Sequence, residues 1–128
     1  LHMVLEDRAS VELCRHEPML HADVRRTIRL LLLSRRCSRA DVAKRLGIHP
    51  RTLGRRLQES GTTFQALLDD MRAQMARQLL LDTRLPVARI AAAVGYADPT
   101  IFSRAFARWT GRTPSAFRAE LVARARHG

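Results

Sequence analysis

Two arginines, Arg55 and Arg104, stand at corresponding positions of two similar segments, and hydroxyl side chains lie close to each. A guanidinium group can bind a guanine edge through two parallel hydrogen bonds, and threonine or serine can bind a base or a phosphate. An arginine on a solvated surface is the simpler interpretation of either residue alone, but the matched register of the two segments favours nucleic-acid contact. The residues that we predict to contact bases are Arg51, Thr52, Arg55, Thr100, Ser103 and Arg104.

The two segments belong to an internal repeat. Residues 41–48, Asp-Val-Ala-Lys-Arg-Leu-Gly-Ile, align with residues 89–96, Arg-Ile-Ala-Ala-Ala-Val-Gly-Tyr, and residues 53–57 align with 102–106. Small, glycine, aliphatic and arginine positions agree in one order, which two unrelated short helices would rarely share. We therefore interpret the two segments as a duplication.

Each copy has the pattern of a helix-turn-helix unit: a short helix, a turn at Gly47 or Gly95, and a second helix whose outward face remains free. We place the first unit at 38–59 and the second at 86–109. Such a second helix can enter the major groove of duplex DNA, where base edges differ most.

The elements around these units are predicted to be helical. Apolar residues recur at spacings of three and four, and no sustained alternation indicates a strand. The sequence predicts an all-α fold of about seven helices, two helix-turn-helix subdomains joined by a long linker helix. These helices are expected near residues 21–35, 38–46, 50–59, 63–82, 86–94, 99–109 and 114–124.

The long helix at 63–82 is expected to supply a core to both units. Its predicted buried residues are Leu68, Met71, Met75 and Leu79. Along 99–109 the apolar residues that recur at helical spacing are Ile101, Phe102, Ala105 and Phe106. The chain of 128 residues is expected to form one domain over 21–128, with residues 1–20 as the remains of a linker and Leu1-His2-Met3 as a cloning scar.

The charge balance agrees with a polyanionic partner. The chain carries 23 basic and 12 acidic residues, for a net charge of +11, and two basic blocks at 25–56 and 84–118 flank a slightly acidic segment. A GC-rich genome also favours arginine over lysine, and that explains most of the arginine bias. The sequence shows no membrane span or export signal, and its two cysteines fit a reducing cytoplasm.

Other chemistry has weaker support. Cys14, His16 and His21 lack a second pair of ligands, so neither zinc nor a cofactor is expected. Asp69 and Asp70 are adjacent on a helix and do not face each other, which argues against paired acid and base catalysis. No glycine-rich phosphate loop or nucleophile elbow is present, so an enzyme is not expected.

Three aromatic residues, Phe106, Trp109 and Phe117, could stack on bases, but they recur at the spacing of a helical core. We therefore expect them to be buried.

The second unit resembles the DNA-binding domain of the AraC/XylS family of bacterial transcription regulators. The resemblance covers about 21–124 and rests on Ile90-Ala91, on Gly95-Tyr96, on Phe102-Ser103-Arg104-Ala105-Phe106 and on the segment from Gly111 to Arg118. The first unit, through 41–43 and 49–53, is similar to members with an arabinose-binding-type N-terminal domain.

The resemblance implies sequence-specific binding of double-stranded DNA, with two recognition helices in successive major grooves. It also implies RNA polymerase as a partner, and an effector and dimerisation domain in an N-terminal region that this chain lacks. The residues expected to contact phosphate are Ser38, Arg39, His49, Arg56, Arg112 and Thr113.

Two positions depart from the family pattern. His49 stands where serine commonly caps the first recognition helix, so Pro50 or a DNA phosphate is expected to hold that helix start. Gly54 stands where a longer side chain is common, so either a contact is missing or the backbone approaches DNA more closely. Glycine also weakens the helix by up to ~1 kcal/mol relative to alanine.

Two other functions remain as alternatives. A nonspecific polyanion-binding helical module would bind all sequences alike. A DNA-repair methyl acceptor carries a similar DNA-binding segment, but it needs a cluster of zinc-binding cysteines, which Cys14 and Cys37 alone do not supply.

Overall fold

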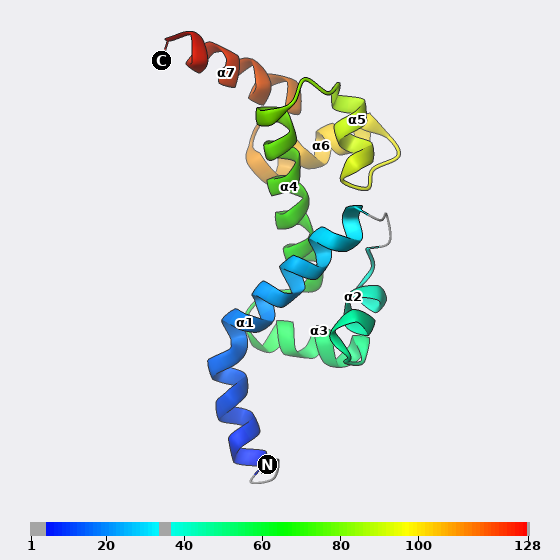
Figure 1. Cartoon of the computed structure of the whole chain (residues 1–128), viewed down its shortest axis with the longest axis vertical. Helices are drawn as coiled ribbons and strands as arrows, with labels where there is room; N and C mark the ends of the chain where they lie inside the picture. Colours follow the sequence, from blue (N-terminus) through cyan, green and yellow to red (C-terminus); the bar gives the residue numbers. More distant parts are fainter. Residues whose placement is uncertain (1–4, 34–36, 128) are drawn as a thin grey trace.

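The computed structural model describes the path of residues 5–33 and 37–127, and the side chains of residues 19–33 and 37–125. All regular elements in these ranges are α-helices, which confirms the predicted all-α fold (Figure 1). The helices are α1 (Leu5–Leu33), α2 (Arg39–Leu46), α3 (Pro50–Glu59), α4 (Phe64–Asp82), α5 (Val87–Ala93), α6 (Pro99–Thr110) and α7 (Pro114–His127). None of them, within the described ranges, is both long and apolar enough to cross a membrane.

Helix α1 is longer than the sequence suggested. It begins at Leu5, whereas the predicted helix began at 21, so most of the segment interpreted as linker is helical. The segment was interpreted as a linker because it is acidic and its apolar pattern is weak. The helix nevertheless continues through Pro18 to Leu33.

The first unit is built from the second half of α1, α2, α3 and the start of α4. Its core is aliphatic and includes Ile28, Val42, Leu53 and Leu57, all with no exposed surface. Helix α1 packs against both α2 and α4, and α2 packs against α3. The small two-helix motif therefore depends on α1 and α4 to complete its core.

The second unit is built from the end of α4 with α5, α6 and α7. Its core contains Ile90, Val94, Phe102 and Phe106, again with no exposed surface. Helix α5 packs on α6, while α7 contacts both α4 and α6. Phe106 is buried in this cluster, as predicted, whereas Trp109 and Phe117 are only half-buried and pack against it.

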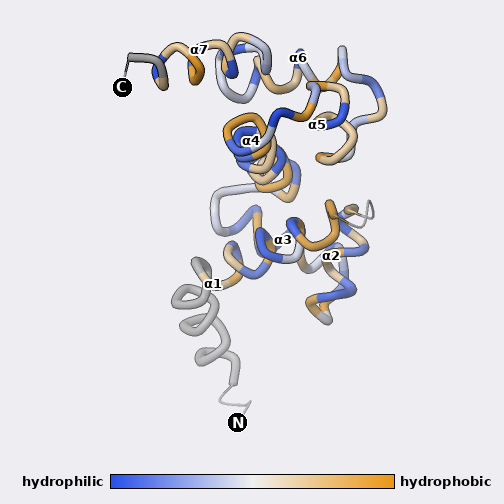
Figure 2. The backbone as a smooth tube through the Cα atoms, turned by 45° about the horizontal axis from the view of Figure 1, so that its top comes forward, coloured by the Kyte–Doolittle hydropathy of each residue, from blue (hydrophilic) through white to orange (hydrophobic). Residues whose placement is uncertain are grey.

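Helix α4 is the element that both units share. Figure 2 shows it running between α1–α3 on one side and α5–α7 on the other. Leu68 and Met71 are buried in the first core, as predicted. Met75 and Leu79 are only half-buried, and Ala76 and Leu80 instead fill the second core. The prediction for Met75 and Leu79 was wrong because the buried face of α4 turns to meet a different unit in its second half.

Met75 packs against both clusters. The described residues thus form two cores, and the same α4 side chain, that of Met75, packs against both.

The C-terminal helix is tied to the loop that follows α4. The guanidinium of Arg118 on α7 donates to the carbonyl oxygens of Leu80, Thr83 and Leu85, at 3.4, 3.2 and 2.6 Å. These bonds satisfy carbonyl groups in the last turn of α4 and in the loop that follows it. They fix the path from α4 into α5, and hence the placement of the second unit on the shared helix.

Candidate nucleic-acid interface

The two turns adopt the same backbone geometry. Gly47 and Gly95 have φ angles of 74° and 93°, in the left-handed region that favours glycine. The next residue then bonds back into the first helix, from Ile48 N to Ala43 O at 3.0 Å and from Tyr96 N to Ala91 O at 2.8 Å. The duplication inferred from the sequence is therefore a duplication of structure, and it sets the direction of each second helix.

Both second helices, α3 and α6, begin with a side-chain cap and a proline. Asp98 Oδ1 accepts a hydrogen bond from Thr100 N at 2.8 Å, with Pro99 in the first turn of α6. His49 Nδ1 accepts one from Arg51 N at 3.1 Å at the start of α3. The histidine therefore does cap α3, together with Pro50, and the helix start needs no phosphate to hold it.

The outward face of α3 carries the residues that the sequence placed there. Arg51 and Arg55 are exposed, and Thr52 is partly exposed between them, while Leu53 and Leu57 on the opposite face are fully buried. The helix is thus anchored through its leucines, and its two guanidinium groups remain free to approach a partner.

The outward face of α6 has the same arrangement and carries one further exposed residue, Ile101. Thr100 and Arg104 are exposed and Ser103 is partly exposed, but Ile101 is also 54% exposed. The sequence placed Ile101 in the apolar repeat of 99–109 and not among the outward residues, whereas in the structure Phe102 fills the core position and Ile101 lies outward. An isoleucine on an otherwise polar outward face was the signal that could have identified it.

Gly54 leaves room that a residue of the preceding helix uses. The position that a Cβ atom would take at Gly54 lies 3.1 Å from Nη1 of Arg39, which extends from α2 across α3. The space of the missing side chain is therefore occupied by a guanidinium group from the neighbouring helix. This adds Arg39 to the charged groups over the outward face of α3.

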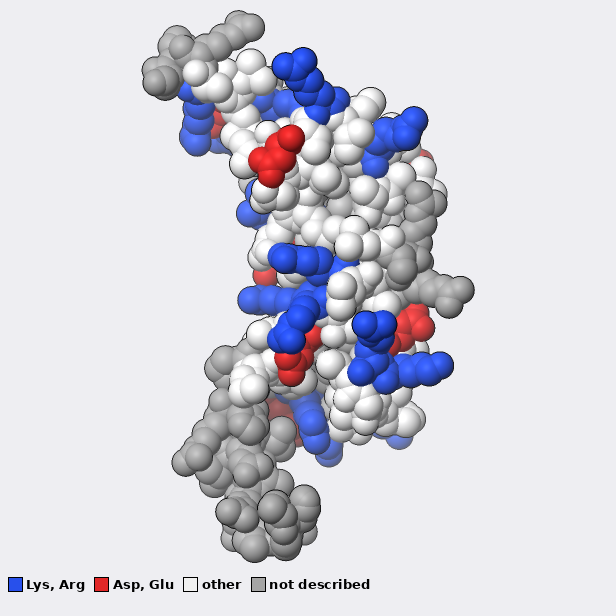
Figure 3. Space-filling model, viewed as in Figure 1, with Lys and Arg blue, Asp and Glu red and all other residues white. Residues whose placement is uncertain are grey.

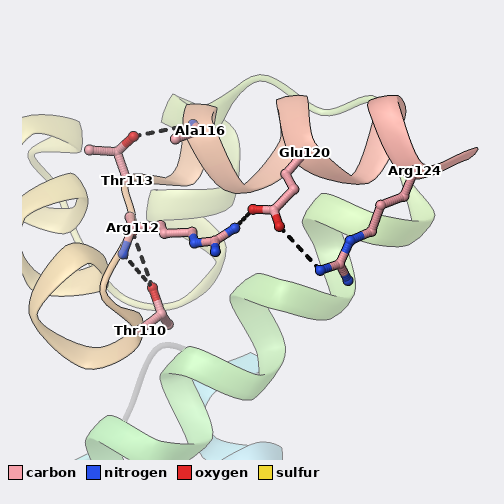
Figure 4. Close-up of polar contacts among 6 residues, drawn as sticks. All are labelled: Thr110, Arg112, Thr113, Ala116, Glu120 and Arg124. Atoms are coloured by element: carbon pink, nitrogen blue, oxygen red, sulfur yellow. Dashed lines mark hydrogen bonds and ion pairs between the residues drawn. The ribbon is translucent and has the colours of Figure 1, made fainter.

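The residues predicted to contact phosphate have several partners within the protein. Ser38 caps α2 by accepting a hydrogen bond from Asp41 N at 3.1 Å, and its hydroxyl also donates to the Asp41 carboxylate at 2.8 Å. Arg56 is partly buried, and its Nε has no hydrogen-bond partner. At the far end of α6, Arg112 forms an ion pair with Glu120 of α7 (Figure 4).

Thr113, beside Arg112, accepts a hydrogen bond from Ala116 N at 3.2 Å and so caps α7 (Figure 4). Arg124 also pairs with Glu120, at 3.2 Å. Arg112 and Thr113 therefore hold α7 in place, and a phosphate would have to compete with Glu120 for Arg112.

The other candidate chemistry finds no support among the described side chains. No group of three or more metal-ligating residues occurs there, and His21 is bonded to Ser60 Oγ at 2.7 Å. Cys14 and His16 lie outside the described side chains. Asp69 and Asp70 turn to different partners, Gln65 at 2.9 Å and Arg25 at 3.5 Å, as expected for a solvated face.

The basic surface is uneven. Figure 3 shows lysine and arginine side chains gathered over the α1–α3 half of the molecule and more widely spaced over α5–α7, with acidic groups between them. Helices α3 and α6 both begin on the right of Figure 1, next to the turns that precede them. The two helices therefore begin on the same side of the molecule.

Comparisons with known proteins agree with this geometry. The model of a helix-turn-helix domain family matches residues 42–120. The ornithine utilization regulator of Pseudomonas aeruginosa is 39% identical over 126 residues, which cover 91% of this chain and 37% of that protein. The arabinose operon regulatory protein of Escherichia coli is 37% identical over 81 residues, 62% of this chain and 28% of that protein.

Among solved structures, the DNA-binding domain of the transcription factor AdpA, crystallised with a target DNA, superposes with a TM-score of 0.67. It is 26% identical, and the match covers 82% of this chain and 97% of that one. This chain spans less than two fifths of the length of the two regulators above. The family model matches more than half of the chain, so the protein belongs to the AraC-type helix-turn-helix family of transcription regulators.

Proposed function

We propose that this chain binds double-stranded DNA sequence-specifically as part of a bacterial transcription regulator, with α3 and α6 in successive major grooves. The observation that carries the proposal is the pair of equivalent recognition faces. Each lies on a helix that follows the same turn, is capped at its start and begins on the same side of α4. A module that binds any polyanion needs a basic surface but no such repeated geometry.

The length of α4 agrees with this arrangement. Its 19 residues correspond to about 28 Å at a rise of ~1.5 Å per residue. Successive major grooves on one face of B-DNA are separated by about 34 Å. Two units joined by this helix can therefore reach neighbouring grooves without a long movement of either unit.

Base contacts are assigned to the outward residues of each recognition helix. Arg55 and Arg104 suit guanine, to which an arginine can donate two hydrogen bonds. Ile101, exposed on α6, suits the methyl group of a thymine. The remaining side chains assigned to bases are Arg51, Thr52, Thr100 and Ser103.

Phosphate contacts are assigned around the ends of these helices. In the first unit Ser38 and Arg39 lie at the start of α2, His49 stands at the start of α3, and Arg56 lies in its last turn. In the second unit Arg112 and Thr113 follow α6, where Arg112 would exchange Glu120 for a phosphate. Because phosphate contacts carry no sequence information, replacing these residues should weaken binding to all sequences alike.

Selection of bound sequences from random duplex DNA tests the proposal. We expect a bipartite site, bound more tightly than its scrambled version, whose affinity falls by about 0.9 log units per log unit of salt for each phosphate contacted. Equal affinity for the selected and scrambled duplexes would favour the nonspecific polyanion binder. A salt slope near zero would contradict the electrostatic contribution.

The spacing between the two half-sites tests whether both units bind at once. Inserting five base pairs turns the second half-site to the opposite side of the duplex, so most of the specific affinity should be lost. Inserting ten base pairs restores the phase but lengthens the distance, which a rigid α4 does not accommodate. Undiminished binding to the five-pair insert would contradict simultaneous binding.

The partners of the whole regulator extend beyond this chain. Because the matched relatives are much longer, we propose that an effector and dimerisation domain accompanies it and that the bound regulator contacts RNA polymerase. Such a protein would act in the bacterial cytoplasm, on the nucleoid. Copurification of the full-length regulator with RNA polymerase on promoter DNA tests the polymerase contact.

A further inference from the structure

A hollow of about 340 Å³ lies where the two units approach each other. Leu32 and Cys37 reach it from the first unit, Arg72 from the middle of α4, and Tyr96 and Ala97 from the second unit. Ala97 lies just before the cap of α6, and Cys37 just before the cap of α2. The hollow therefore lies between the segments that lead into α2 and α6, whose starts are capped by Ser38 and Asp98.

Arg72 is a cation without a counter-ion. Among the residues whose side chains are described, no carboxylate lies within ion-pair distance of it, and its buried Nε has no hydrogen-bond partner. Its guanidinium carbon lies 5.0 Å from the centre of the Tyr96 ring, which holds the group in place. A partly buried cation of this kind is costly unless an anion accompanies it.

Cys37 does not supply that anion. Burial raises the pKa of its thiol above the ordinary value, and Asp41 adds to the rise, while Arg72 opposes it. The net direction is upward, so the thiol is protonated and neutral near pH 7. No described group within ion-pair distance therefore balances the positive charge of Arg72.

The place of the hollow indicates which group would balance this charge. Its lining includes the turn just before α6, and this turn and the start of α3 lie on the same side of α4 in Figure 1. Two recognition helices in successive major grooves leave a stretch of minor groove between them, bounded by the phosphates of both strands. A protein surface midway between the helices therefore meets phosphate rather than base edges.

We propose that Arg72 binds a DNA phosphate between the two half-sites, in the hollow between the units. The inference rests on the proposed binding of one duplex by both recognition helices. It makes α4 part of the interface as well as its spacer. Because Leu32, Arg72 and Tyr96 come from three parts of the fold, the contact forms only when both units face the same duplex.

Neutral methylphosphonate linkages, placed one at a time between the half-sites of the selected duplex, provide the test. For the wild-type protein, one position should lower affinity about tenfold, the scale of a lost hydrogen bond between charged groups. The Arg72→Met variant should bind the unmodified duplex about tenfold more weakly and should lose its sensitivity to that linkage. Its salt slope should fall by about 0.9, with base preference unchanged.

Arg77→Met is the matched control, because Arg77 is exposed on the same helix and does not line this hollow. It should keep the wild-type response to the modified linkage. If Arg72→Met remains as sensitive to the linkage as the wild type, Arg72 only holds the two units together and the phosphate assignment is wrong.

Where Arg72→Met does not fold, the linkage scan with the wild-type protein decides the question. Equal affinity for every modified duplex would overturn the inference while leaving sequence-specific binding intact. Failure to select any preferred duplex would instead contradict the proposed function itself.

Discussion

The two helix-turn-helix units share a backbone plan but fill it differently. Leu53 and Leu57 hold α3 in an aliphatic core, whereas Phe102 and Phe106 hold α6 in an aromatic one. The rings of Phe102 and Phe106 lie 5.9 Å apart, and the Phe106 and Phe117 rings 5.7 Å apart, edge to face. Such ring pairs add to the free energy gained from burial.

The starts of the recognition helices also differ, and α6 again has the more stabilising features. Helix α6 has a carboxylate cap in Asp98, which suits the positive end of a helix, while α3 has the imidazole of His49 and a glycine at its fifth residue. The same backbone architecture therefore carries one firmly held recognition helix, α6, and one that is less firmly held, α3. We expect α6 to resist local opening more than α3 does.

Core truncation has the largest expected effect. Phe106→Ala should destabilise the second unit by about 3–5 kcal/mol, and Leu57→Ala at the equivalent position should destabilise the first by about 2–5 kcal/mol. Because the two cores are joined mainly through α4, each change should speed hydrogen exchange most in its own unit. Equal acceleration in both units would show that the cores unfold as one.

Truncation of the two arginines assigned to base readout comes next. Arg104→Ala and Arg55→Ala should each lose about 1–3 kcal/mol of discrimination at one or two base pairs, in different half-sites. The measurement is affinity for a set of single-base variants of the selected duplex. Arg108→Ala, an exposed arginine in the last turn of α6, is the control. A loss of equal size for all duplexes would reassign Arg104 to phosphate.

The helix caps should differ by a smaller amount. Asp98→Ala should cost about 1 kcal/mol, the usual value for a lost carboxylate cap, and His49→Ala should cost less. Replacing the histidine by a better cap in His49→Ser should then stabilise α3. Urea unfolding of the three variants measures these differences. A larger loss for His49→Ala than for Asp98→Ala would reverse the order of the two units.

The smallest effect concerns Gly54. Gly54→Ala gains up to about 1 kcal/mol of helix propensity, but the new methyl group meets the guanidinium of Arg39. We expect a net stabilisation of about half that propensity gain, rising to nearly the full gain when Arg39→Met removes the obstruction. Gly47→Ala is the contrasting control, because the φ angle of 74° there strains any residue with a Cβ atom.

If Gly54→Ala changes the free energy of unfolding by the same amount with and without Arg39→Met, Arg39 does not occupy the space over α3. The contrast with α6, which has no glycine among its residues, would then rest on helix propensity alone.

The sequence predicted most of the fold because its helix signals are local. Ser38, Pro50 and Pro99 mark helix starts that the structure places within a residue of the prediction. The helix through Pro18 was missed because its pattern is weak. Ile101 was not recognised as an outward residue because a run of apolar residues does not show where the core face of a helix ends.

The candidate site was predictable only in part. Spacing along a helix placed Arg55 and Arg104 on outward faces, which their exposure now supports. The contact of Arg39 with the space over Gly54, and that of Arg72 with Tyr96, join residues from different helices. Such contacts depend on how helices pack, and no local pattern in one helix carries that information.

The hydrogen bonds from Arg118 to the loop after α4 affect which residues of that loop can change. All three of its acceptors are backbone carbonyls, which every amino acid provides. The side chains of Arg84 and Leu85 can therefore change without loss of this anchor, whereas the Thr83 hydroxyl itself donates to Leu79 O and accepts from Leu85 N. If this loop were redesigned to bind a new partner, we expect α6 to keep its orientation as long as Arg118 on α7 is retained.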